Sequence, residues 1–271
     1  MKFSLTVLGS SSAVPTAARN TTAHVLNVHE RFYLIDCGEG TQIQIRRNRI
    51  RLGKLHALFI SHLHSDHILG LFGLLSTLSL LGRKVGIDLY GPPGLETILN
   101  AHFNLVPEKL LYPLVFHPLN QDGLMQIRSD KSVEVFSFPV PHRTATWGFL
   151  FRERLNGRIQ ESRLPRSYAF CTDTLFHPPL ADHFKGCSLL YHEATYSAQH
   201  ASRAESTGHS TAAQAAEMAR LARAGQLLIG HFSARYKDIS PLLNEAQAIY
   251  PQTIGAYDGL VIDIVAQLPD K

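Results

Sequence analysis

The sequence predicts an α/β fold, in which short apolar strands alternate with a few long helices. Short continuous apolar runs such as 57–60 are typical of buried strands, and the run 68–81 has the length and apolar density of a buried helix. Polar clusters directly follow several of these runs, as they do in α/β proteins that carry their chemistry on loops at strand ends. No repeat or linker divides the 271 residues, so we expect one domain over residues 1–271.

Taken in order, each element follows from its apolar pattern and from the turn residues beside it. The expected strands are 3–8, 23–28, 31–35, 57–60, 85–90, 133–138, 146–151, 168–171, 188–191 and 226–229. The second and third form a hairpin that ends in the glycine-punctuated loop 36–40. The expected helices are 68–81, 95–104, 212–224 and 240–250. Ser210 and Thr211 can cap the third helix, and Pro241 can open the fourth.

The composition is that of an ordinary globular protein, with 45% hydrophobic and 18% charged residues. The formal net charge of +4 suits a polyanionic partner without requiring one. The three cysteines (Cys37, Cys171 and Cys187) have no CxxC spacing, which argues against a disulfide framework and against a cysteine-ligated zinc. No signal peptide and no bilayer-spanning apolar stretch is found, so we expect a cytoplasmic protein without membrane attachment.

The string Ser61-His62-Leu63-His64-Ser65-Asp66-His67 directly follows a predicted buried strand. It holds four potential metal ligands within six residues, and three of them are imidazoles. In an extended segment His62 and His64 project to the same side, because side chains alternate with a period of two. Asp66 and His67 follow on a turn and can face a neighbouring point. Scattered polar loop residues would not require this density, so the string predicts a metal centre that can hold two ions.

Two metals need more ligands than one string supplies, so the remainder has to come from distant loops. His142, Asp173 and His231 each follow a predicted strand. Taken alone, each is as easily a hydrogen-bonded loop residue as a ligand. Together with the histidine string, the three favour a dinuclear site.

Four further motifs are more specific than the histidine pattern alone. They are Leu8–Pro15, Ile35–Gln42, His192–Thr195 and His231–Tyr236. The pattern His-x-His-x-Asp-His with a separated His, Asp and His resembles the metallo-β-lactamase superfamily, whose fold is an αβ/βα four-layer sandwich. The four motifs resemble ribonuclease Z, the family of endonucleases that trims transfer RNA precursors at the 3′ end. The similarity covers most of the chain.

The resemblance implies two zinc ions, although manganese or iron also occupies such sites. One ion would be bound by His62, His64 and His142. The other would be bound by Asp66, His67 and His231. Asp173 would bridge the two, since a carboxylate can span two cations. A water held between two such cations loses its proton near neutral pH and becomes a nucleophile.

The resemblance also implies roles for residues around the metals. Asp66 would orient or deprotonate the water, and His209 would protonate the leaving oxygen, unless it is an ordinary surface histidine near a helix start. Glu193 would orient His209 as its partner, unless it is a structural buried carboxylate. Arg235 and Ser233 would bind substrate, with a structural ion pair as an equal alternative for the arginine. Asp36 would support a ligand histidine.

Only the segment 143–172 separates His142 from Asp173, whereas ribonuclease Z usually carries a longer insertion there. In many members that insertion includes a protruding arm that grips the elbow of transfer RNA. We therefore expect this arm to be absent or shortened, with a short basic hairpin that turns at Asn156-Gly157. Its arginines can equally contact phosphates or form a solvated basic surface: Arg152, Arg154, Arg158, Arg163 and Arg166.

The function that the resemblance implies is that of a zinc-dependent phosphodiesterase. It would be an endoribonuclease that cleaves precursor transfer RNA at its 3′ side with a metal-activated hydroxide. Two alternatives stay open: a phosphodiesterase for small substrates such as cyclic nucleotides, favoured by the missing arm, and a non-catalytic RNA-binding subunit that keeps the fold. The resemblance also implies a homodimer, with the apolar helix after Asp66 as the candidate interface.

Overall fold

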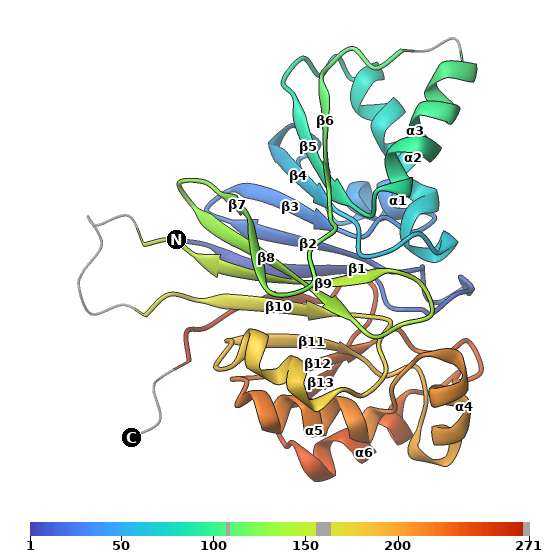
Figure 1. Ribbon diagram of the computed structural model, residues 1–271, viewed down its shortest axis with the longest axis vertical. Coiled ribbons are helices and arrows are strands. Elements are labelled where there is room, and N and C mark those ends of the chain that lie inside the picture. Colours follow the sequence, from blue (N-terminus) through green and yellow to red (C-terminus); the bar gives the residue numbers. More distant parts are fainter. Residues whose placement is uncertain (107–108, 156–163, 268–271) are drawn as a thin grey trace.

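Two seven-stranded β-sheets packed face to face form the centre of the computed structural model, which describes residues 1–106, 109–155 and 164–267 (Figure 1). The strands of the first sheet are β1 (Phe3–Gly9), β2 (Ala23–Val28), β3 (Arg31–Ile35), β4 (Leu55–Phe59), β5 (Ile87–Gly91), β6 (Leu114–Pro118) and β14 (Val261–Asp263). Those of the second are β7 (Met125–Ser129), β8 (Val133–Val140), β9 (Thr146–Glu153), β10 (Ser167–Cys171), β11 (Leu189–Glu193), β12 (Leu227–Gly230) and β13 (Thr253–Gly255). The orders are β14-β1-β2-β3-β4-β5-β6 and β13-β12-β11-β10-β9-β8-β7.

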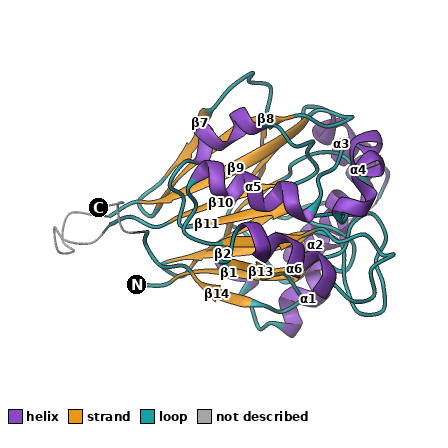
Figure 2. Cartoon of the chain, turned by 90° about the horizontal axis from the view of Figure 1, so that it is seen from below, coloured by secondary structure: helices purple, strands orange, loops and turns teal. Residues whose placement is uncertain are grey.

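Helices cover the outer faces of both sheets (Figures 1 and 2). Those beside the first sheet are α1 (Thr41–Arg47), α2 (Ser65–Leu80) and α3 (Gly94–Leu105). Those on the side of the second are α4 (Ala201–Thr207), α5 (Ala212–Ala222) and α6 (Ser240–Ile249). Short 3-10 helices lie at Leu52–Lys54, Pro178–Phe184 and Ala198–His200. The order helix, sheet, sheet, helix is the αβ/βα four-layer sandwich, which confirms the expected fold class.

Two hydrophobic cores hold these layers together. Aromatic side chains fill the space between the sheets, where Phe59 packs against Tyr90, Phe149 and Phe151 at ring-centroid distances of 4.9, 5.5 and 5.2 Å. The second core joins the first sheet to its helices and is aliphatic, with Leu71 of α2 among its buried members. Each fully buried apolar side chain of this size stabilises the fold by about 1.5–3 kcal/mol. The strand ends that carry the polar clusters are therefore fixed by a rigid interior.

Parallel pairing brings the candidate functional loops to one end of the sandwich. Strands β3 to β6 are parallel to one another, and so are β10 to β13. The carboxyl ends of parallel strands meet at one edge of a sheet, which is where α/β proteins place their sites. The loops after β3, β4, β10, β11 and β12 consequently converge. β1 also ends at this edge. It runs from the side of the molecule where the N-terminus lies to the side where these loops converge, and residue 10 begins the loop that follows it (Figure 2).

Several element boundaries differ from those that the sequence predicts. Helix α2 begins at Ser65, three residues before the expected start, so that Asp66 and His67 lie on its first turn. It is also not buried all round, because Leu69 and Leu80 are 49% and 80% exposed. The capping of α5 is confirmed: Thr211 forms a capping box with Gln214. The helix then ends at Ala222, before the predicted residue 224, with the next residue in a left-handed conformation.

The segment between β9 and β10 is closed at its base by the backbone hydrogen bond from Glu153 N to Arg166 O, 2.8 Å. The expected turn at Asn156-Gly157, together with Arg158 and Arg163, lies outside the described residues. Among the described residues, no helix has the length and hydropathy that crossing a membrane requires.

Candidate metal centre

The histidine string begins directly after β4 and ends on the first turn of α2. His64 is the N-cap residue of that helix and keeps an extended backbone, with φ −63° and ψ 147°. His62 and His64 therefore lie on the same side of an extended stretch, as their spacing predicts. Their rings meet at right angles, with Nε2 of His62 2.9 Å from Nδ1 of His64.

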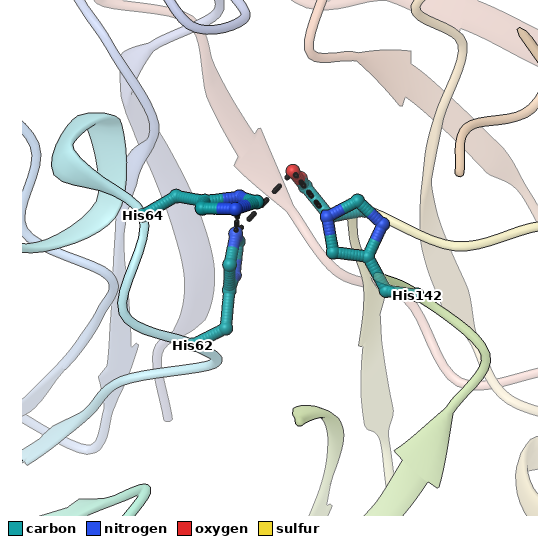
Figure 3. Close-up of side chains that lie close together, drawn as sticks. His62, His64 and His142 are labelled. Atoms are coloured by element: carbon teal, nitrogen blue, oxygen red, sulfur yellow. Dashed lines mark hydrogen bonds and ion pairs between the residues drawn. The ribbon is translucent and has the colours of Figure 1, made fainter. Parts of the chain in front are cut away.

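His142 reaches the same point from the loop after β8. Its ring centroid lies 5.4 Å from that of His62 and 5.2 Å from that of His64. The three rings face one another across a small gap (Figure 3). One nitrogen of each ring and one oxygen of Asp173 all lie within 4.8 Å of one another, a spacing that can hold one metal ion.

A second group of ligands lies beside the first. Oδ2 of Asp66 is 3.3 Å from Nε2 of His67 and 3.5 Å from Nε2 of His231. The side chains come from the first turn of α2 and from the loop after β12, and all three are buried. This group also has the spacing of a site for one ion.

Asp173 stands between the two groups and turns one oxygen to each. Oδ2 lies 3.4 Å from Nε2 of His62 and 3.9 Å from Nε2 of His142. Oδ1 lies 3.1 Å from Nε2 of His231 and 3.4 Å from Nε2 of His67. This is the arrangement that a carboxylate bridging two cations requires. The structure thus brings together all seven residues that the sequence analysis singles out as ligands.

The donor set fits two divalent cations. The Nε2 atoms of His67, His142 and His231 are buried and have no hydrogen-bond partner among the described residues. A buried polar atom without a partner is costly, and a metal ion would supply the missing contact at each of these nitrogens. Imidazole nitrogen and carboxylate oxygen are ligands that zinc accepts, and manganese and iron also bind them.

The other ring nitrogen of each buried ligand histidine is fixed by a neighbour. Nδ1 of His142 lies 2.8 Å from Gly208 O, and Nδ1 of His231 lies 2.9 Å from Thr195 Oγ1. Such contacts set the orientation of the ring and leave Nε2 free to bind a metal. His62 has the same support from Ser61 Oγ, which is 3.0 Å from its Nδ1.

Asp36 supports His67 in the expected manner. Its Oδ2 lies 2.7 Å from Nδ1 of His67, while its two oxygens accept hydrogen bonds from Ser61 N at 2.8 Å and Ser61 Oγ at 2.9 Å. Burial opposes a charge on His67, but the carboxylates of Asp66, Asp173 and Asp36 outweigh it and raise the pKa of His67 well above its usual value. A metal ion would compete with the proton for this imidazole.

Carboxylate ionisation is strongly favoured at the centre. Burial raises the pKa of Asp173, but the neighbouring His231, His67 and His62 reverse this effect and hold the pKa well below its ordinary value. The pKa of Asp66 is likewise lowered, because the charge and hydrogen bonding of His67 and His231 outweigh burial. Both carboxylates are therefore in the form that binds cations.

His209 lies at the rim of the centre, two residues before the N-cap of α5. Its Nδ1 is 2.8 Å from Oε1 of the buried Glu193, which also accepts a hydrogen bond from Thr174 N at 2.9 Å. Burial lowers the pKa of His209, but the charge and hydrogen bond of Glu193 outweigh it and raise the pKa to about 9. The imidazole therefore carries a proton at neutral pH in the absence of bound cations.

A cavity of about 530 Å³ opens above the centre. It is lined by ligands of both groups and by His209, Tyr196, Ser233 and Arg143. Arg235 lies beside it, with its guanidinium 5.1 Å from the centroid of the Tyr196 ring. No acidic partner of Arg235 lies within ion-pair distance in the described chain, so the alternative of a structural ion pair is not supported for this residue. Its Nε donates to Oγ of Ser233 at 3.3 Å.

The described arginines near the shortened segment have different environments. Arg166 is buried and pairs with both oxygens of Glu153, at 2.8 and 2.6 Å, which makes it a structural cation and corrects its inclusion among phosphate contacts. Arg154 donates to Ser129 Oγ, and Arg152 lies over the ring of Phe136. These two remain at the surface.

Comparison with known proteins gives a consistent family. A family model described as a β-lactamase superfamily domain matches residues 31–232. Ribonuclease Z of Bacteroides fragilis strain YCH46 is 39% identical over 302 positions, covering 97% of this chain and 99% of the relative. Ribonuclease Z of Porphyromonas gingivalis strain W83 is 38% identical, with the same two coverages. The 302 positions exceed the 271 residues of this chain, so the relative contains residues that have no counterpart here.

A solved structure supports the same assignment. The short form of human tRNase Z superposes with a TM-score of 0.82 at 29% identity, covering 96% of this chain and 99% of the human chain. The crystal structure of a long form of RNase Z from yeast shares the fold, with a TM-score of 0.79 at 19% identity. From the site geometry and these relatives together, the chain belongs to the ribonuclease Z family of the metallo-β-lactamase superfamily.

Proposed function

We propose that this chain is a metal-dependent endoribonuclease that cleaves precursor transfer RNA at its 3′ side. The observation that carries the proposal is the pair of three-ligand groups joined by Asp173, which opens into a cavity that His209 lines. Centres of this kind attack phosphodiesters, and the relative that matches over 97% of the chain is named ribonuclease Z.

In this proposal the ligands are the seven side chains already described. His62, His64 and His142 hold one ion, Asp66, His67 and His231 hold the other, and Asp173 bridges them. Two bound divalent cations would activate water for attack and stabilise the charge that develops on the phosphate. Zinc is the proposed metal because of the ligand type, with manganese or iron as substitutes.

Residues at the centre and at the rim of the cavity carry out the proton transfers and bind the substrate. Asp66 has its Oδ2 directed into the centre, where it orients the attacking water and accepts its proton. His209 donates a proton to the ribose oxygen that leaves, and Glu193 keeps His209 oriented and protonated. Ser233 and Arg235 bind the phosphate beside the scissile bond, because they stand at the rim of the cavity with their donors close together.

The test is cleavage of a 3′-extended transfer RNA by the purified chain in the presence of zinc or manganese. We expect one cut at the 3′ side that leaves a 3′-hydroxyl and a 5′-phosphate, and we expect a chelator to abolish it. If a model diester such as bis(p-nitrophenyl) phosphate is hydrolysed while the RNA stays intact, the RNA assignment is wrong and the metal assignment stands.

A second candidate is a phosphodiesterase for small substrates such as cyclic nucleotides. It is favoured by the short connection between β9 and β10, which leaves few residues for gripping a large RNA. It predicts fast turnover of a small diester and weak RNA binding that disappears as salt rises. Tight binding with a steep salt dependence would favour the RNA substrate, because each phosphate contact releases counterions.

We also propose a cytoplasmic homodimer. The exposed apolar side chains Leu69 and Leu80 on α2 offer the surface for a second copy, since large exposed apolar groups on one helix are often covered by a partner. Sedimentation at several concentrations tests this: a mass of about 30 kDa at every concentration would rule the dimer out.

A further inference from the structure

The backbone N–H of Ala13 is a contact to the metal centre that comes from the N-terminal loop. It donates to Oδ2 of Asp66 at 2.8 Å, and this is the oxygen that faces both His67 and His231. Ala13 has φ 53°, a backbone conformation that costs energy for a residue with a side chain. Something in the surrounding structure has to hold the loop in place for this contact to persist.

The same loop is joined to the segment that carries His231. Phe232 N donates to Ser10 O and Ser12 N donates to Phe232 O, both at 3.0 Å. Farther along the loop, a guanidinium nitrogen of Arg19 donates to Tyr236 O at 2.7 Å. Residues 10–20 therefore contact two of the three ligands of the second group, Asp66 by a direct bond and His231 through its neighbour in the chain.

Asp258 fastens both ends of this loop. Its Oδ1 accepts hydrogen bonds from Ser10 N at 3.0 Å and Ser10 Oγ at 2.8 Å. Its Oδ2 accepts from Asn20 N at 2.6 Å and Asn20 Nδ2 at 2.8 Å. Ser11 N also donates to Asn20 O at 2.9 Å. The carboxylate therefore joins the two ends of the loop where they already lie side by side. Hydrogen bonds to a charged acceptor are among the stronger ones in proteins.

Pairing with β1 fixes the position of Asp258 itself. Gly259 N donates to Val7 O at 2.8 Å, and Val7 N donates to Leu260 O at 2.9 Å. The carboxylate is thereby held at the end of β1 where the loop begins. The supports of the other ligand group are different: His142 is held by Gly208 and His62 by Ser61. Within the described residues, no hydrogen bond joins the 10–20 loop to His62, His64 or His142.

We propose that Asp258 is a positioning residue for the Asp66–His231 half of the metal centre. Acting through residues 10–20, it holds the Ala13 amide against Asp66 and so keeps Oδ2 of Asp66 directed at the second ion. The inference rests on the proposed function only in requiring that the centre binds metal. It predicts that Asp258 affects the metal position at Asp66 and His231 and does not affect the position at His62, His64 and His142.

The experiment compares Asp258→Ala and Asp258→Asn with a matched control, Asp130→Asn. Asp130 is also a partly buried carboxylate with several donors, among them Tyr33 Oη at 2.7 Å and Ser132 N at 2.8 Å. It precedes β8, whose far end leads to His142, so it lies at the opposite end of the sandwich from the metal centre. Removing its charge tests the effect of losing a hydrogen-bonded carboxylate as such.

The probe is Zn²⁺ alone, titrated by calorimetry into the metal-free full-length chain. We expect the wild type and Asp130→Asn to bind two equivalents with the same affinities. Asp258→Ala should bind one equivalent normally and the other about 10- to 100-fold more weakly, the usual effect of losing a support behind a ligand. Asp258→Asn should lie between, because its amide oxygen still accepts from Ser10 while its NH₂ group cannot accept from Asn20.

In kinetics with the 3′-extended transfer RNA, the Asp258 variants should lose kcat with KM little changed. Zinc added in excess should restore much of that kcat, a rescue that a general loss of folding would not show. If Asp258→Ala binds two equivalents at wild-type affinity, the inference about Asp258 is wrong while the proposed function stands. The same holds if Asp130→Asn loses as much zinc affinity as Asp258→Ala. A wild-type chain that binds no zinc would instead overturn the proposed function.

Discussion

Glu193 holds His209 by a hydrogen bond between its Oε1 and Nδ1 of the imidazole, 2.8 Å long. The carboxylate is fully buried and lies on β11, whereas the histidine lines the cavity. Because a buried charge needs compensation, the pair keeps a proton on the imidazole, which lines the cavity above the candidate metal centre. In the proposed mechanism this pair supplies the proton to the leaving group, a step separate from nucleophilic attack.

Replacing His209 by alanine should therefore slow RNA cleavage much more than hydrolysis of an activated diester. A ribose oxygen is a poor leaving group and needs the proton, a contribution of about 10²- to 10⁴-fold. A nitrophenolate leaves without one, so the rate with bis(p-nitrophenyl) phosphate should change only a few-fold. Steady-state rates on both substrates, with the zinc content of each sample determined, make the comparison. Equal losses on both would show that His209 acts through the metals.

The Glu193→Gln substitution should move the alkaline limb of the RNA cleavage profile to lower pH. The charge of Glu193 raises the pKa of His209, so removing that charge lowers the pKa and the general acid loses its proton earlier. Bound cations would lower the pKa of His209 in both the wild type and the variant, but the pKa would still be lower in the variant. The profile of kcat against pH checks this, with the nitrophenyl diester as the substrate whose profile should not shift. An unchanged limb on RNA would assign the acid role to another group.

Asp173→Asn should remove activity on both substrates together, because it weakens the shared support of both metals. An amide carries no charge and cannot bridge two cations as a carboxylate does. We expect about 10²-fold or greater loss of kcat on RNA and on the diester, with less than two equivalents of zinc retained after dialysis. The measurement combines elemental analysis of the bound zinc with the rates on both substrates. Two retained equivalents with normal rates would contradict the bridging role.

The ligand set was predictable because its members carry strong local signals. His62 to His67 form a dense string, and His142, Asp173 and His231 each follow a strand whose apolar pattern is evident. Parallel strand ends meet at one edge, so such residues converge once the topology forms. The α/β class followed from the same patterns, whereas the four-layer sandwich was implied by the resemblance to the metallo-β-lactamase superfamily. The roles of these residues in catalysis remain predictions.

The supports of the site were harder to predict. Ala13 acts through its backbone N–H, and Gly208 acts through its carbonyl, so the residue type at either position does not indicate the contact. Thr195 and Asp258 are common residue types whose partners lie far away in the chain. A sequence pattern reports local spacing, whereas these contacts depend on which loops the packed sheets bring together.

Three of the elements that the sequence analysis did not predict share a physical reason. Strands β6 and β7 are short, and none of their residues is buried, so neither has the buried apolar face that marks a core strand. Helix α1 is short, follows a glycine-rich turn and ends in Arg46 and Arg47, so its sequence carries no clear helical pattern. All three depend on tertiary contacts more than on local preference.

A final prediction concerns stability and uses a histidine outside the metal centre. His24 is fully buried on β2, with its Nδ1 2.7 Å from Tyr168 Oη, and burial lowers its pKa to about 3. The unfolded chain would titrate this imidazole near its ordinary value of 6.5. Since the folded pKa is the lower one, the stabilisation is present above pH 6.5 and is lost as the pH falls from 6.5 toward 3.

The free energy of unfolding of the wild type should thus fall by about 2 kcal/mol more than that of His24→Asn between pH 7 and pH 5. Asparagine has an oxygen near the position of Nδ1 and can accept from Tyr168, but it does not titrate in this range. Urea denaturation of both proteins in the presence of a chelator isolates the effect, because the metal ligands are common to both and cancel. Parallel pH dependences would contradict the prediction, and so would an imidazole NMR signal of His24 that titrates near pH 6.5 in the folded protein.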